Sequence, residues 1–282
     1  MRAFSPTSID EACAMMAAGG TPPTPMAGCT DVLAHWPGNL AGKERAYLDL
    51  SGVGELRGVR WTGTHMQLGA LATYWDVVTD ARCVAEMPLL VAAARTIGAV
   101  QIQSRATWAG NIANASPAAD GVPALMALDA SVVLVSGNGG AGGLEREEVR
   151  LDEFYLGYKK LRMRTGQLIE AVRVPRRPRS VSIFEKVGAR RAQAITKVGA
   201  AIARSDAGWR VVANSVAPTV RRCRAVEEML EAGAVVRSPL GFAAALAKDV
   251  APIDDIRSTA AYRRAVLGRV LYFALRGKAG VV

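Results

Sequence analysis

Apolar and polar positions in the first half of the chain alternate between helical and strand-like periods. Ser8, two acidic residues, an alanine- and methionine-rich stretch and two glycines predict a capped helix that ends at Gly20. β-Branched and aromatic runs predict short strands, and longer apolar stretches predict helices. The predicted strands are 46–50, 56–61, 66–68 and 131–135, and the predicted helices are 74–80, 88–97 and 122–128. Helices and strands in mixed order favour an α+β protein.

The pattern changes at residues 174–179, where the sequence VPRRPR holds two prolines and three arginines. Such a segment is typical of a linker, so we expect two domains, 1–175 and 176–282. A chain of 282 residues is long enough to bury two cores. After the linker, the pattern predicts strands at 182–186, 196–203 and 209–216 and helices at 224–232, 240–247 and 260–276.

Charge is divided unevenly between the two halves. Residues 1–158 hold 10 Lys and Arg against 16 Asp and Glu, whereas residues 159–282 hold 25 against 9, which gives the whole chain a net charge of +10. Arginine accounts for 28 of the 35 cations, and its planar guanidinium suits lasting pairs with carboxylates. Aromatic residues do not interleave with the arginines, so we expect no nucleic-acid partner. We expect the basic half to dock on acidic surface of partner chains or a second copy, through Arg176, Arg177, Arg179, Arg190, Arg191, Arg221 and Arg222.

Several kinds of chemistry are disfavoured by the residues present. The four cysteines are far apart and form no C-x-x-C pair, and the two histidines lack metal-ligand spacing, so no metal site is expected. Acidic residues stand where the apolar core of an export signal would be, which predicts a cytoplasmic protein. The longest apolar stretches are too short for a transmembrane segment.

The sequence GNGGAG at 137–142 satisfies G-x-G-x-x-G but lacks its context. Glu145, Glu147 and Glu148 follow, and they would set carboxylates where a pyrophosphate should bind. We interpret these glycines as a hairpin tip.

Two other segments carry better candidate chemistry. Residues 104–120 concentrate hydroxyls, amides, small residues and one carboxylate, and such neutral donors can hold a diphosphate without a lysine. Residues 26–33 place a glycine, Thr30 and Asp31 at a predicted strand-to-helix turn, which suits a phosphate. A polar surface loop and an ordinary helix cap explain each segment equally well when taken alone. Together they suggest one extended ligand gripped from two sides.

The sequences AGCTDVL at 27–33 and TWAGNIANASPAAD at 107–120, with Ile97-Gly98 and the F-x-K of 184–186, carry a family resemblance. They resemble the FAD-binding subunit of the molybdenum hydroxylases, the medium chains of xanthine dehydrogenase and carbon monoxide dehydrogenase type enzymes. The resemblance covers nearly the whole chain. It implies an α+β fold with an FAD-binding domain of the PCMH (vanillyl-alcohol oxidase-like) type, followed by a small C-terminal domain of sheet plus helices.

The resemblance also implies which residues hold the cofactor, and it implies no catalytic side chain. The first loop would wrap the FAD diphosphate, and the second would contact the diphosphate, ribityl chain and adenosine. Two isoleucines would lie near the cofactor, and one lysine near the isoalloxazine. For these three, core packing or an exposed strand end is the alternative. The set is Ala27, Gly28, Cys29, Thr30, Asp31, Val32, Ile97, Thr107, Gly110, Asn111, Asn114, Ser116, Asp120, Ile169 and Lys186.

By the same resemblance, FAD is the cofactor of this chain, while molybdopterin lies on a large partner subunit and [2Fe–2S] clusters on a small one. Electrons would pass from the clusters through FAD to an external acceptor such as NAD, a quinone or O2. The family has glycine in place of Cys29 and Ala109, and a small aliphatic residue in place of Trp108. The added Cβ at Ala109 is expected to lower FAD affinity, above all if that residue needs a positive φ. Three alternatives stay open: a stand-alone FAD oxidoreductase, a basic scaffold that has lost FAD, and a basic nucleic-acid binder whose affinity would fall steeply with salt.

Overall fold

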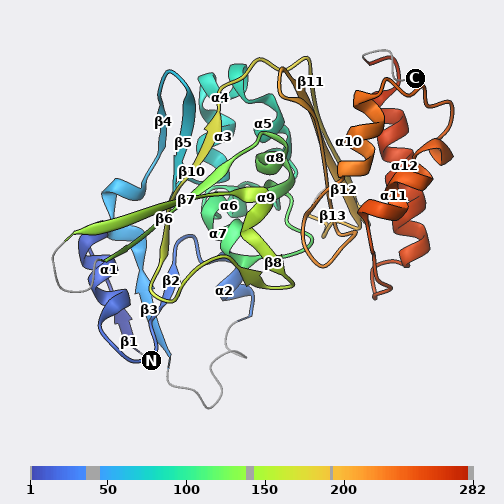
Figure 1. The fold of residues 1–282 in the computed structure, drawn as a ribbon. Helices are drawn as coiled ribbons and strands as arrows, with labels where there is room; N and C mark the ends of the chain where they lie inside the picture. Colours follow the sequence, from blue (N-terminus) through green and yellow to red (C-terminus); the bar gives the residue numbers. More distant parts are fainter. Residues whose placement is uncertain (1, 36–44, 138–142, 191–192, 279–282) are drawn as a thin grey trace.

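The computed structural model describes residues 2–35, 45–137, 143–190 and 193–278 (Figure 1). The first part of the chain is built on a five-stranded antiparallel sheet of order β4-β5-β10-β6-β7. Its central strand β10 reads LIEAVRVP and lies between two strands that are also rich in β-branched or apolar residues. The strands are β4 (Val59–Trp61), β5 (His65–Gly69), β6 (Ser131–Gly137), β7 (Leu144–Arg150) and β10 (Leu168–Pro175).

A three-stranded parallel sheet of order β1-β3-β2 accompanies the larger sheet at the N-terminal end of the chain. A two-stranded hairpin, β8 and β9, follows the short helix α9. The strands are β1 (Arg2–Phe4), β2 (Thr24–Met26), β3 (Ala46–Asp49), β8 (Tyr155–Gly157) and β9 (Lys160–Leu161). The first predicted helix is present as α1 (Ile9–Ala17), and its N-cap Ser8 accepts a hydrogen bond from the Glu11 amide at 3.2 Å.

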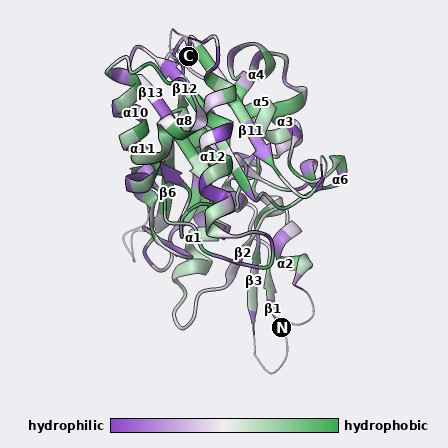
Figure 2. Ribbon diagram, turned by 90° about the vertical axis from the view of Figure 1, so that its right-hand side faces the viewer, coloured by the Kyte–Doolittle hydropathy of each residue, from purple (hydrophilic) through white to green (hydrophobic). Residues whose placement is uncertain are grey.

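Most helices of the first part lie between its large sheet and the second part of the chain. Helix α8 is buried over its whole length and packs on β12 and β13, because its sequence GVPALMA has no charged residue (Figure 2). The helices are α2 (Thr30–Ala34), α3 (Tyr74–Thr79), α4 (Ala81–Glu86), α5 (Pro88–Arg95), α6 (Val100–Gln103), α7 (Trp108–Asn114), α8 (Gly121–Ala127) and α9 (Leu151–Phe154), with 3-10 turns at Leu50–Gly52 and Gly54–Leu56.

The second part is a four-stranded antiparallel sheet with helices on its outer face (Figure 1). Side chains alternate between the two faces of a strand. Ala200 and Ile202 of β12 therefore join an outer core with α10 and α12, whereas Ala201 and Ala203 join the core of the first part. The elements are β11 (Val181–Val187), β12 (Val198–Ser205), β13 (Gly208–Asn214), β14 (Arg221–Arg222), α10 (Arg224–Glu231), α11 (Ala243–Asp249) and α12 (Ala260–Leu275), with a 3-10 turn at Pro239–Phe242.

Three sequence predictions are corrected. The predicted helix 240–247 is a 3-10 turn followed by α11, and β4 begins only at Val59. The segment 104–120 is no polar surface loop, because it contains the whole of α7, with Trp108 and Ile112 fully buried. The glutamates after the glycine motif belong to β7, which pairs with β6 so that Gly137 faces Leu144; residues 138–142 lie outside the described residues.

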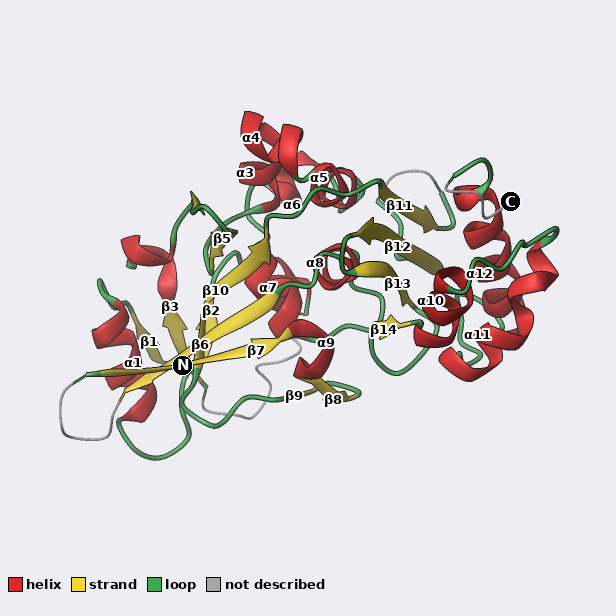
Figure 3. Cartoon of the chain, turned by 45° about the horizontal axis from the view of Figure 1, so that its top comes forward, coloured by secondary structure: helices red, strands yellow, loops and turns green. Residues whose placement is uncertain are grey.

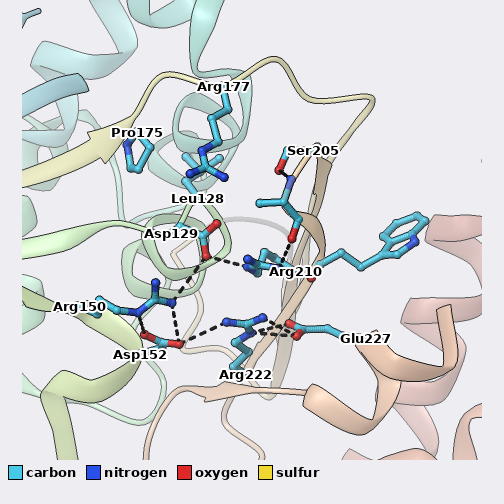
Figure 4. A network of polar contacts seen from close by, with 12 residues as sticks. Leu128, Asp129, Arg150, Asp152, Pro175, Arg177, Ser205, Arg210, Arg222 and Glu227 are labelled. Atoms are coloured by element: carbon cyan, nitrogen blue, oxygen red, sulfur yellow. Dashed lines mark hydrogen bonds and ion pairs between the residues drawn. The ribbon is translucent and has the colours of Figure 1, made fainter. Parts of the chain in front are cut away.

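The two parts are joined by a network of partly buried ion pairs (Figure 4). Asp129 accepts from Arg210 at 2.6 Å, and Asp152 accepts from Arg150 at 3.0 Å and from Arg222 at 3.3 Å. Burial alone raises the pKa of Asp152, but hydrogen bonds and charges from the two arginines hold that pKa below its usual value. Acidic residues of the first part therefore neutralise arginines of the second.

Five of the seven arginines expected to dock on partner chains have partners within the chain. Arg177 lies 3.8 Å from Asp206, and Arg190 donates to the Gln193 carbonyl at 2.7 Å. Arg176 pairs with Glu86 at 2.9 Å, Arg179 donates to backbone carbonyls, and Arg222 pairs with Asp152 and Glu227. Arg191 lies outside the described residues. A docking surface would have to rely on the remaining arginines.

Candidate functional site

The two loops singled out in the sequence meet at one cavity. The cavity has a volume of about 690 Å³ and opens between β2, α7 and the start of β10. That volume is within the range of cofactor pockets. Twelve of the fifteen predicted cofactor-binding residues line it: Ala27, Gly28, Cys29, Thr30, Asp31, Val32, Ile97, Thr107, Gly110, Asn111, Asn114 and Ile169. Ser116, Asp120 and Lys186 do not.

The first loop, between β2 and α2, is pressed against the second. A Cβ added at Gly28 would lie 1.8 Å from the carbonyl oxygen of Arg105, so only glycine allows this approach. The next residue, Cys29, adopts a left-handed conformation with φ of 60° and caps α2. This is the position where the family resemblance expects glycine, and the conformation gives the physical reason. Burial raises the pKa of the Cys29 thiol, which makes it an unsuitable nucleophile.

The second loop is fixed by residues 72–74, which precede and begin α3. The Trp108 amide donates to the Ala72 carbonyl at 3.2 Å, and its indole N–H donates to the Thr73 carbonyl at the same distance. The ring of Trp108 packs on that of Tyr74, with centroids 4.6 Å apart. Thr107 then begins α7, and its hydroxyl accepts from the Gly110 amide at 3.0 Å. Figure 3 shows α7 beside β10, where it forms one wall of the cavity.

The expected effect of Ala109 is not supported by its conformation. Ala109 lies in the first turn of α7 and has no positive φ. The residues of these loops that do adopt a left-handed conformation are Cys29 and Ala115, with φ of 60° and 50°.

A chain of three polar residues holds the loops together, and we call it the Asp31–Asn114–Lys159 clasp. The Asn114 amide donates to the Asp31 carboxylate at 3.0 Å. Lys159, from the hairpin β8–β9, donates to the Asn114 backbone carbonyl at 2.5 Å and to its side-chain oxygen at 2.8 Å. The clasp connects α2, α7 and the β8–β9 hairpin, and its Asp31 and Asn114 belong to the cavity lining.

Two buried polar atoms of the cavity lining have no partner in the described protein. They are the Tyr74 hydroxyl and the side-chain oxygen of Asn111. A Cβ added at Gly121 would lie 2.8 Å from the first and 3.0 Å from the second, so glycine keeps a space between them. Buried polar atoms are almost always hydrogen-bonded. Their arrangement suits a polar group of a bound ligand, and the residues present therefore fit a cofactor with hydroxyls and phosphates.

Asp120 and Lys186 lie together outside the cavity lining, between the two parts of the chain. The Lys186 ammonium is 2.7 Å from Asp120 and also donates to the Thr96 carbonyl at 2.9 Å. Thr196 and Asn214 donate to the other Asp120 oxygen at 2.5 and 3.1 Å. Both oxygens of this carboxylate are thus bonded within the chain. Ser116 accepts from the Ala118 amide at 3.3 Å in the same segment.

The structure adds residues that the sequence did not single out. Tyr74, Lys159 and the segment 163–168, which includes Arg164, reach the site from elements far away in sequence. The sequence contains no local signal for them, because each acts through a tertiary contact. In the part of the chain that the structure describes, no group of three or more His, Cys, Asp or Glu side chains is arranged to hold a metal ion. A search of the same residues finds no helix with the length and apolar character needed to cross a bilayer.

Two family models match the chain. Residues 1–177 match the FAD binding domain in molybdopterin dehydrogenase, and residues 184–277 match the CO dehydrogenase flavoprotein C-terminal domain. The carbon monoxide dehydrogenase medium chain of Hydrogenophaga pseudoflava is 27% identical over 96% of this chain and 94% of its own length. The xanthine dehydrogenase FAD-binding subunit of Escherichia coli O157:H7 is 27% identical over 84% of this chain and 82% of its own length.

A solved structure agrees. Carbon monoxide dehydrogenase from Hydrogenophaga pseudoflava, which lacks the Mo-pyranopterin moiety of its cofactor, contains a chain with a TM-score of 0.85 and 26% identity, covering 98% of this chain and 96% of that one. The expected α+β class, with an FAD-binding part followed by a sheet-and-helix domain, is confirmed. The chain therefore belongs to the FAD-binding medium subunits of the molybdenum hydroxylase family, which are subunits of oxidoreductases.

Proposed function

We propose that this chain relays electrons within a molybdenum hydroxylase complex, from [2Fe–2S] clusters on a small partner subunit to an external acceptor such as NAD, a quinone or O2. A large partner subunit carries the molybdopterin, and the assembly is cytoplasmic. We further propose that residues 1–175 and 176–282 are the two domains. FAD, when bound, takes up electrons singly and releases them as a pair. The chain itself supplies binding, orientation and shielding.

One observation carries this proposal: two loops about 75 residues apart, which only together predicted one extended ligand, line a single cavity and are joined by the clasp. A surface loop or a routine helix cap would not require Gly28 to approach the Arg105 carbonyl so closely. The matches to carbon monoxide and xanthine dehydrogenase subunits over most of their length support the same reading.

The residues divide into three roles under this proposal. Gly28 and the amides that follow it bring backbone close to the diphosphate, while Tyr74 and Asn111 offer buried hydrogen-bonding atoms. Ile97 and Ile169 form an apolar part of the cavity wall. Asp120 and Lys186 do not contact the cofactor under this proposal. They connect the second part of the chain to the end of the second loop.

The test is to purify the chain alone and together with its partner subunits. We expect a yellow protein with a flavin absorption band, which binds added FAD after extraction and is reduced by substrate only when the partners are present. A colourless protein that binds no FAD in calorimetry would refute the proposal in favour of a scaffold. Substrate turnover by the isolated chain would refute it in favour of a stand-alone oxidoreductase.

A further inference from the structure

A second cavity, of about 500 Å³, lies at the N-terminal end of α5. The linker between β10 and β11 forms one wall, and the corner between α4 and α5 forms another (Figure 1). None of its lining residues is shared with the cofactor cavity. We call it the linker pocket; it is lined by Gly63, residues 85–89, Leu128, residues 176–179 and Ser182.

The linker pocket is rich in positive charge that the chain does not neutralise. Of its three arginines, Arg176 has a close carboxylate, Glu86, at 2.9 Å. The nearest carboxylate to Arg177 is Asp206 at 3.8 Å, and that aspartate is 81% exposed. Arg179 has no ion pair within the described residues, and its guanidinium donates only to backbone carbonyls, among them that of Pro175 at 3.2 Å. Two guanidinium groups thus line the pocket without a close counter-charge.

The N-terminus of α5 and the hydroxyl of Ser182 also favour an anion in the linker pocket. Helix α5 has eight residues and begins at Pro88, and no side chain caps its N-terminus at the pocket. A helix N-terminus carries partial positive charge and favours anions. The Ser182 hydroxyl, across the pocket, makes no hydrogen bond in the described protein and is free to donate.

We propose that the linker pocket binds a small oxyanion of the phosphate type, held by Arg177, Arg179 and Ser182 against the start of α5. Guanidinium forks match the oxygens of such an anion bidentately. The anion would connect the linker to α5, whose far end lies beside Thr96, the residue that accepts from Lys186. Occupancy would therefore brace the two parts of the chain against each other.

Inorganic phosphate is the first probe, added to the FAD-loaded chain at constant ionic strength with chloride as the reference anion. We expect saturable binding in calorimetry, a raised melting temperature and an unchanged flavin spectrum. AMP compared with adenosine then tells whether the phosphate is taken free or as part of a nucleotide. Equal effects of phosphate and chloride would overturn the proposal.

The variant is Arg177→Gln, because this side chain is exposed and its ion pair with the exposed Asp206 is long, at 3.8 Å. Binding of phosphate is expected to weaken about tenfold. The matched control is Arg237→Gln, an exposed arginine outside the pocket, which should leave binding unchanged. Equal phosphate affinity in wild type and Arg177→Gln would refute the site. Loss of phosphate binding when the partner subunits assemble would also refute it, because the pocket would then receive an acidic group of a partner.

Discussion

Replacing Gly28 by alanine tests the contact between the two cofactor loops. The new Cβ would lie 1.8 Å from the carbonyl oxygen of Arg105 and 2.6 Å from its carbonyl carbon. Carbon and oxygen approach no closer than about 3.3 Å in ordinary contacts, so the loops must separate by about 1.5 Å. Both contact partners are backbone, and no side chain can rotate away. The separation also strains the 3.0 Å hydrogen bond from Asn114 to Asp31.

The magnitude follows from these two effects. Overpacking of a close contact costs about 1–3 kcal/mol, and loss of one net hydrogen bond costs about 1 kcal/mol. If the penalty falls on the bound state, a total of about 2–4 kcal/mol weakens FAD binding by about 30-fold to 1,000-fold, at 1.4 kcal/mol for each factor of ten.

The assay is FAD titration of the extracted protein, followed by calorimetry or by flavin fluorescence. Gly54→Ala is the matched control, because a Cβ at Gly54 meets nothing within 4 Å. Circular dichroism shows whether each variant is folded. A folded Gly28→Ala protein with the Kd of wild type would show that the close approach of the loops does not shape the cofactor site.

Three further predictions concern single side chains. Cys29→Gly removes the strain of a left-handed residue and should raise the free energy of unfolding by about 0.5–1 kcal/mol in urea titrations. A free energy of unfolding below that of wild type would contradict the left-handed conformation of Cys29. Tyr74→Phe removes a buried hydroxyl that has no partner within the described protein. FAD should therefore bind about fivefold more weakly, while the apoprotein keeps its stability. An unchanged Kd for FAD would place the hydroxyl away from the cofactor. Asp152→Asn should cost about 1–2 kcal/mol at pH 7, because Arg222 and the half-exposed Arg150 lose a charged partner. The pKa of Asp152 is lowered in the folded state, so its contribution to the free energy of unfolding is complete above about pH 4 and is lost as the pH falls below that value. Urea titrations from neutral to acid pH should therefore show a steeper loss of this free energy in wild type than in the variant.

The periodic elements were predictable from the sequence because their residues act locally. The Ser8 cap, the β-branched run of β6 and the long helix α12 all satisfy short-range rules. Helix α7 was not predicted, since its sequence WAGNIAN mixes a glycine and asparagines with apolar residues. Its helical state depends on Trp108, which packs on Tyr74 from another element.

The residues of the site also divide into those that the sequence identified and those that it did not. Residues of the two loops were identified because a motif places them together in sequence, and ten of them line one cavity. Lys159 and Tyr74 were not, because nothing near them in sequence marks a ligand site. The uneven charge was visible in the sequence, but its use was not: Asp152 neutralises Arg222, which the sequence suggested for a partner surface, and Asp129 neutralises Arg210.

The core of the first part also contains Ala201, Ala203, Val212 and Val220, which the second part contributes. The packing therefore crosses a boundary that is clear in the sequence. Cutting the chain at the linker would expose apolar surface on both pieces and leave the Asp120 carboxylate without its partners. The two parts should unfold in one cooperative transition, and FAD bound by the first should raise the melting temperature of the second by mass action.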